Sequence, residues 1–229
     1  MPSGSFYDNI HLRTDNRPQL EQAWQSYWEG RGESWAWISP VYAGWISVFD
    51  WRCDQQDADT LTDLAAYLSR HAECVAVAFQ VQNSELAEYW LFNAGDEVDH
   101  YTSDSDYFAA YAQRTELAEH EEVYDGYGPD ISPGYEMEED RTDGGNADLM
   151  KSLTGSATTS MEIEAILRTP AYIADDILTA LASVVNINNS WASLGYRYLF
   201  TEGDTVLGFG QFHHLPPGEP PQVVPPAER

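Results

Sequence analysis

The segment CVAVAFQVQN, residues 74–83, decides the fold because it is nearly continuous in apolar residues. A strand with one face in water alternates apolar and polar side chains, whereas a run without alternation is typical of a strand covered on both faces. We therefore predict a central strand here and assign the neighbouring segments outward from it.

The segments before this strand alternate between strand and helix patterns. A helix is predicted after Asp59, with one apolar face. Before it, SWAWISPVYAG (residues 34–44) and WISVFDWRC (residues 45–53) are rich in β-formers and are predicted to form a strand pair split at Ala43 and Gly44. Apolar residues of the predicted helix at i, i+3, i+4 and i+7 spacing are Leu61, Leu64, Ala65 and Leu68.

The first thirty residues add one more strand and helix. In DNRPQLEQAWQSYWEG (residues 15–30), Asn16 is a suitable N-cap, Pro18 suits the first turn, and Gly30 ends the run. FYDNIHLRT (residues 6–14) predicts a strand with imperfect alternation. The apolar face of the helix consists of Leu20, Trp24, Tyr27 and Trp28.

A hairpin follows the central strand. Residues 88–93 read as a strand, NAGD supplies turn residues, and residues 97–101 return as its partner. The order is strand, helix, strand, strand, helix, strand, strand, strand. This order predicts an α+β protein with a ferredoxin-like βαββαβ sandwich and an added β-hairpin over residues 1–103.

The rest of the chain divides into three parts. Residues 104–145 are predicted to be an acidic irregular linker, because the sequence from Asp96 to Asp148 contains 17 acidic residues and only two arginines. Residues 146–214 are predicted to form helices, including a capping box of Thr159 and Glu162, and a terminal β-hairpin in LGYRYLFTEGDTVLGFGQF (residues 194–212), packed on the first part. Residues 215–229 hold six of the twelve prolines and predict a disordered tail.

The charge excludes several partners. A formal net charge of -27 repels nucleic-acid phosphates and anionic membranes, so neither is expected as a partner. Adaptation to a salty cytoplasm gives the same acid excess, so charge alone does not identify a partner. The start MPSGSFYDN has no basic segment followed by an apolar one, which predicts a cytoplasmic protein with Cys53 and Cys74 reduced.

Candidate chemistry is concentrated around residues 96–106. Asp99, His100, Asp104 and Asp106 form a candidate metal site or acid/base group, although loop carboxylates are more often solvated. His213 and His214 would point to opposite faces of a strand, which is poor geometry for one metal. No GxSxG, GxGxxG or GxxxxGK[ST] motif occurs, so we expect no nucleotide and no other cofactor.

Seven of the eight tryptophans lie before residue 91. The spacing of Trp24 and Trp28 favours a large core under a small sheet. The alternative is that some of these rings are exposed, for example Trp35 and Trp37 on one strand face, and mark a ligand or partner surface rimmed with acid.

Several segments occur in an order that resembles a family of bacterial proteins with no assigned activity. They include FYDNIHLRT, LTDLAAYLSRHAECVAVAF, YWLFNAGDEVDHYTSDSDYF and LGYRYLFTEGD. The resemblance covers most of residues 6–205 and implies no catalytic or binding residue.

Two functions stay open on the sequence. The first is an acidic binding or regulatory module, of the immunity-protein kind, that uses an acidic face against a basic protein. The alternative is a small hydrolase or metal-assisted enzyme centred on Asp99, His100 and Asp104, which requires these groups to converge in a pocket.

Overall fold

The computed structural model describes residues 5–103, 142–154, 157–168, 174–206 and 208–216. These residues form an α+β protein with one eight-stranded sheet, in the order β7-β6-β5-β4-β1-β3-β2-β8. Every pair of neighbouring strands is antiparallel. The strands are β1 (Tyr7–Leu12), β2 (Ala36–Ile38), β3 (Ile46–Asp50), β4 (Val75–Gln82), β5 (Leu86–Asn93), β6 (Asp96–Thr102), β7 (Asp143–Gly144) and β8 (His213–Leu215).

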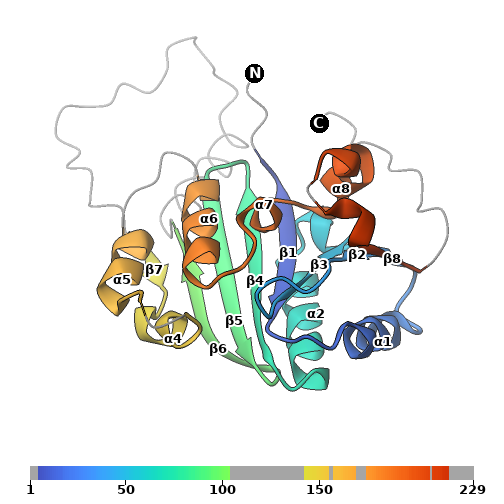
Figure 1. Ribbon diagram of the computed structural model, residues 1–229, viewed down its shortest axis with the longest axis horizontal. Helices are drawn as coiled ribbons and strands as arrows, with labels where there is room; N and C mark the ends of the chain where they lie inside the picture. Colours follow the sequence, from blue (N-terminus) through green and yellow to red (C-terminus); the bar gives the residue numbers. More distant parts are fainter. Residues whose placement is uncertain (1–4, 104–141, 155–156, 169–173, 207, 217–229) are drawn as a thin grey trace, which may run out of the picture.

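Helices cover both faces of the sheet (Figure 1). One face carries α1 (Arg17–Trp28) and α2 (Ala58–His71). The other carries α4 (Ala147–Ser152), α5 (Ser160–Arg168), α6 (Ala174–Val184), α7 (Asn189–Ala192) and α8 (Tyr196–Glu202). The 3-10 turns are η1 (Cys53–Gln55), η2 (Gly203–Thr205) and η3 (Phe209–Gln211). No helix in the described ranges is long and apolar enough to cross a bilayer.

The prediction of a central strand at residues 74–83 is confirmed. β4 pairs with β1 on one side and β5 on the other, and its six middle residues are buried. α1 begins after Asn16, whose side chain accepts a hydrogen bond from the Gln19 N–H at 3.3 Å. α2 begins at Ala58, slightly earlier than predicted, because Asp57 caps it by accepting from the Thr60 N–H.

Strand alternation divides the core between the two faces. Ile10, Val48 and Ala78 face α1 and α2, and Val77 and Phe79 face the later helices. A third cluster, built on Phe49, Trp191, Tyr196, Leu199 and Phe212, lies under α7 and α8, with Trp35, Trp37 and Trp51 partly buried against it. The later helices therefore cover the second face of the same sheet.

The predicted C-terminal β-hairpin is wrong. Residues 196–202 form α8, followed by η2 and η3, and β8 pairs with β2 instead of with a hairpin partner. Tyr196 and Leu199, three residues apart, bury one side of this helix. Its first turn is also held by Asp54, which accepts a hydrogen bond from the Arg197 N–H at 2.9 Å. A cap supplied from a distant segment leaves no trace in local propensity.

Two predicted boundaries also move. Residues 104–141 lie outside the described ranges, but Asp143 and Gly144 pair with β6, so the segment predicted as a linker through residue 145 contains a short edge strand. Leu215, predicted to begin the tail, pairs with Ala36 and is only 7% exposed, because it closes the core beneath α1. Residues 217–229 lie outside the described ranges.

Candidate functional site

An acidic hollow of about 590 Å³ lies where β6 and β7 meet α4 and α5. Three carboxylates line it, from Asp99, Asp148 and Glu164, and no lysine or arginine is among its lining residues. Met161 also lines it and is 79% exposed. We call this feature the acidic hollow.

Asp99 is held by two hydrogen bonds. Its Oδ2 accepts a hydrogen bond from the Tyr89 hydroxyl at 2.6 Å and another from the Asn146 N–H at 2.7 Å. Burial and the neighbouring Asp99 raise the pKa of Tyr89, so its phenol stays a donor at neutral pH. Asn146 is the N-cap of α4 and therefore ties that helix to β6. Two donors on one oxygen leave the other lone pairs of the half-buried carboxylate available to a ligand.

The other two carboxylates come from the two helices beside the sheet edge. Asp148 accepts from the Ser160 hydroxyl at 2.6 Å, which joins the first turns of α4 and α5. Glu164 is half exposed and pairs with Arg168 at 3.1 Å. Arg168 also donates to Thr142 and to the Gly145 carbonyl, so its guanidinium is committed to the wall of the site. The hollow is therefore a negatively charged, partly ordered concavity.

The structure does not bring together the candidate residues of the 96–106 segment. Asp99 points to the same face as Tyr89, whereas His100 stacks on Trp90 on the opposite face at 5.0 Å between ring centres. His100 Nε2 lies 3.5 Å from Glu88, and this carboxylate raises the pKa of His100. Asp104 and Asp106 lie outside the described residues. Within the described ranges, no three His, Cys, Asp or Glu side chains are grouped as metal ligands.

The histidine pair of β8 is separated in the same way, as predicted. His213 contacts Glu21 of α1 at 2.7 Å. His214 lies on the other face, 3.1 Å from the Tyr196 hydroxyl and 4.5 Å from the ring centre of Trp37. Burial lowers the pKa of His214, which keeps it neutral. The two imidazoles cannot share one metal ion in this arrangement.

The tryptophans divide between the two interpretations left open by the sequence. Trp24, Trp28, Trp45 and Trp90 are buried, which confirms a core role for them. Trp35, Trp37 and Trp51 are only partly buried. A second hollow, of about 620 Å³, lies beside Trp35 and α1.

Three buried carboxylates were not predicted from the sequence. Asp8, Asp50 and Asp54 are each at most 5% exposed. Both carboxylate oxygens of Asp50 accept hydrogen bonds from protein groups. The indoles of Trp24 and Trp28 donate to its Oδ2 at 2.7 and 3.0 Å, and Ser34 donates to both oxygens. Burial nevertheless raises the pKa of Asp50.

Asp8 and Asp54 form a second, less satisfied group. Gln56 donates to Asp8 Oδ1 at 3.2 Å, while Asp8 Oδ2 and Asp54 Oδ1 have no hydrogen-bond partner among the described residues. Burial raises the pKa of Asp54 to about 7 and that of Asp8 well above its usual value, and the charge of Asp54 adds to the shift at Asp8. The signal in the sequence was the imperfect alternation of FYDNIHLRT, where Asp8 shares a strand face with Ile10 and Leu12.

Comparison of the chain with protein-family models, curated proteins and solved structures gives no match. The resemblance to a bacterial family therefore stays a prediction. The features of the described residues that bear on function are the two hollows and the charges around them.

Proposed function

We propose that this protein is a binding module that takes a cationic side chain of a basic partner protein into the acidic hollow. The observation that carries the proposal is the lining, in which Asp99, Asp148 and Glu164 provide negative charge and, of the three, Glu164 is paired with Arg168. An ammonium or guanidinium group entering the hollow would gain charge-assisted hydrogen bonds to these carboxylates.

Three properties of the site support a protein ligand. Asp99 is held in place by Tyr89 and Asn146 before any ligand arrives, which lowers the cost of ordering on binding. Met161 offers an exposed apolar contact beside the charges, as an interface anchor does. The sequence between the two strands that border the hollow, residues 104–141, contains twelve Asp and Glu and two Arg, and such a charge density speeds encounter with cationic surfaces.

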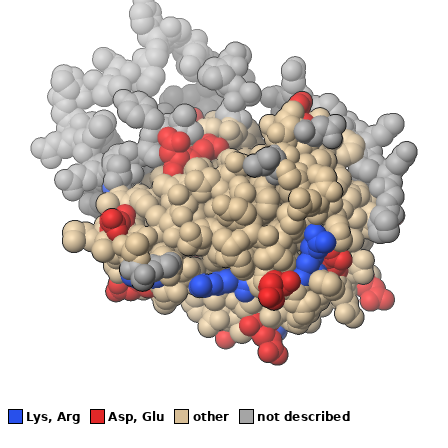
Figure 2. Space-filling view, in the orientation of Figure 1, with Lys and Arg blue, Asp and Glu red and all other residues tan. Residues whose placement is uncertain are grey.

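The charge is not spread evenly over the described surface. Figure 2 shows a face over α6 and α7 that is largely uncharged, with both acidic and basic residues toward its margins. A basic partner would therefore find little charge on this face, and its contacts with carboxylates would lie elsewhere.

A hydrolase or metal-assisted enzyme centred on Asp99 and His100 receives no support from their positions on opposite faces of β6. Acid/base catalysis requires both groups within reach of one substrate. A binding role makes no such demand, because the carboxylates of the hollow act together without a catalytic histidine.

We also infer that β1 to β4 with α1 and α2 form a ferredoxin-like unit. In support, β3 lies between β1 and β2, which α1 connects, and β1 lies between β3 and β4, which α2 connects. This split β-α-β arrangement occurs twice, with both helices on one face. The fold of this unit does not by itself imply a function. The later helices and β5 to β7 are what build the acidic hollow on its edge.

The experiment compares two variants of equal charge. One replaces the hollow carboxylates by Asp99→Asn, Asp148→Asn and Glu164→Gln. The control replaces three exposed carboxylates of the α1 and α2 side, Asp15→Asn, Asp59→Asn and Asp63→Asn. Binding of a fluorescein-labelled hexa-arginine peptide is measured by anisotropy at low salt and at roughly 0.5 M salt. At the higher concentration, screening limits the interaction between charges to a few ångströms.

The expected result is a loss of affinity of about tenfold for the hollow variant, corresponding to ~1.4 kcal/mol, against a much smaller loss for the control. Binding by the unmodified protein should weaken strongly with salt. Equal weakening of both variants would show that only the total charge attracts the peptide, and the proposal would be wrong.

A further inference from the structure

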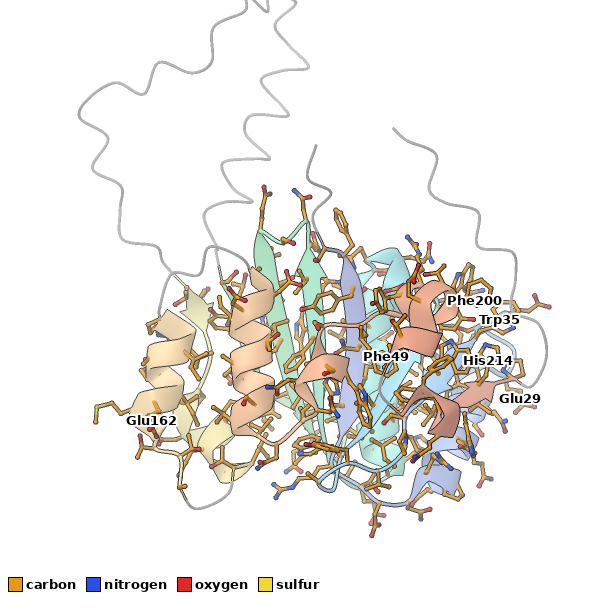
Figure 3. All side chains as sticks on the ribbon, turned by 45° about the horizontal axis from the view of Figure 1, so that its top comes forward. Glu29, Trp35, Phe49, Glu162, Phe200 and His214 are labelled. Atoms are coloured by element: carbon orange, nitrogen blue, oxygen red, sulfur yellow. The ribbon has the colours of Figure 1, made fainter. Side chains whose placement is uncertain are left out.

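The second hollow has the form of an aromatic groove between α1 and residues 32–35. Trp35 is its partly exposed ring, the buried Trp24 and Trp28 lie at its base, and the exposed Glu29 and Glu33 also line it. Figure 3 shows Glu29 and Trp35 at the opposite end of the molecule from Glu162, which belongs to α5 beside the acidic hollow. The aromatic groove is therefore separate from the site proposed above.

The rings of the groove are fixed by their neighbours. Both α1 tryptophans donate their indole N–H to the buried Asp50, which orients them toward β3. Trp35 packs edge-on against Trp51, with ring centres 5.7 Å apart and planes at 88°. Ser34, which also lines the groove, donates to the same Asp50 carboxylate. The groove is thus preformed, and Trp35 is the tryptophan that it presents to a ligand.

The C-terminal strand leads into this groove. Leu215, the last residue of β8, pairs with Ala36 and is buried in the core beneath α1. Pro216 follows immediately and lines the groove. The remaining sequence, residues 217–229, is PGEPPQVVPPAER and contains five prolines.

Proline-rich sequences and aromatic grooves are complementary. A proline-rich segment favours the extended polyproline II conformation, loses little entropy on binding, and docks its rings against aromatic side chains. At ~3.1 Å per residue, thirteen residues reach about 40 Å, whereas α1 with its twelve residues is about 18 Å long. The segment is therefore long enough to follow the whole groove.

We propose that the aromatic groove binds the chain's own proline-rich C-terminal segment, residues 217–229. Attachment at Pro216 places the segment at an effective concentration on the order of millimolar, so a weak contact is enough. Charge does not drive this contact, since Glu219 and Glu228 of the segment approach the acidic side chains of Glu29 and Glu33. Unlike binding in the acidic hollow, this binding should not weaken at high salt.

The test uses a chain truncated after Pro216 and a synthetic acetylated peptide of residues 217–229. Indole N–H resonances of ¹⁵N-labelled protein report the groove. We expect the Trp35 resonance to differ between full-length and truncated chains, and the peptide to restore the full-length position in a saturable titration. Affinity should be unchanged or higher in roughly 0.5 M salt.

Two controls isolate the ring contact. A peptide with its prolines replaced by alanine alters nothing in the protein and should bind roughly tenfold more weakly, as loss of a hot-spot contact requires. Trp35→Ala should abolish binding, while Phe200→Ala, which removes an exposed ring of α8 outside the groove, should not. Circular dichroism checks that both variants are folded.

Three results would overturn the proposal. Identical Trp35 resonances in the full-length and truncated chains would show that the segment does not reach the groove. Equal affinity of the proline and alanine peptides would show that the groove does not recognise the proline rings. Dimerisation of the full-length chain that is lost on truncation would assign the groove to the tail of a second copy instead.

Discussion

Asp54 is a buried carboxyl whose protonation should make the stability of the protein depend on pH. Its pKa is raised from 3.8 to about 7 because burial penalises the charged form. Arg197 offsets part of this penalty through its backbone N–H at 2.9 Å and its guanidinium Nε at 3.8 Å. Asp8, whose pKa is raised in the same direction, adds to the effect.

The sign follows from proton binding. Above pH 4 the unfolded chain loses the Asp54 proton, whereas the folded chain holds it until about pH 7, so the folded state binds more protons in this interval. The stability from this group is complete below pH 4 and is lost as pH rises through 7. A shift of about three pKa units corresponds to roughly 4 kcal/mol, of which about 3 kcal/mol falls between pH 5 and pH 8.

The assay is urea unfolding from pH 5 to pH 8 for the unmodified protein, Asp54→Asn, and the exposed control Asp63→Asn. We expect the free energy of unfolding of Asp54→Asn to gain about 3 kcal/mol relative to the unmodified protein across this range. The free energy of unfolding of Asp63→Asn should change with pH in nearly the same way as that of the unmodified protein. Parallel curves for Asp54→Asn would refute the reasoning, because they would mean that Arg197 keeps Asp54 ionised throughout.

Three further predictions concern local contacts. Thr159→Ala removes the side-chain acceptor of the α5 capping box, which accepts from the Glu162 N–H at 3.2 Å, and should lower the free energy of unfolding by about 1 kcal/mol in urea titration. Trp24→Phe removes one of the donors to the buried Asp50 and should cost about 1–3 kcal/mol; a change within error would mean that the remaining donors suffice. Burial raises the pKa of both thiols, to about 11 for Cys74, so a thiol reagent at pH 8 should label both cysteines quickly only in denaturant, and rapid labelling of native Cys53 would contradict its burial.

Local patterns predicted the first half of the fold well. The apolar run at residues 74–83, the capped helix after Asn16 and the NAGD turn each carry their own signal, and β4, α1 and the β5–β6 hairpin formed as predicted. In these elements, local propensity and the demands of the core agree.

The structure of the second half of the chain depends more on contacts between residues far apart in the sequence. The aromatic stretch at residues 194–212 resembles a strand pair in composition, yet the Asp54 carboxylate caps its first helical turn from 143 residues away. β7 is two residues long and is defined by its pairing with β6, including Tyr101 opposite Gly144. Gly144 is required there, because a Cβ would overlap the His100 carbonyl.

The candidate site was only partly visible in the sequence. Asp99 was named for its place in an acidic hairpin, but its partners Asp148 and Glu164 come from helices that follow a long intervening segment. Residue spacing does not reveal which loop returns to which sheet edge. Strand alternation places the neighbouring Asp99 and His100 on opposite faces of β6, and the prediction of one site from both residues did not take this into account.

The most direct test of the proposed function is the ¹⁵N chemical shift of the Asn146 amide, which donates to Asp99 inside the acidic hollow. Titration with a capped hexa-arginine peptide at low salt should move this resonance along a saturable curve. The shift should disappear in Asp99→Asn and persist in the control Asp63→Asn. An Asn146 resonance that stays fixed while the peptide binds elsewhere on the chain would contradict the proposal that the hollow receives the cationic side chain.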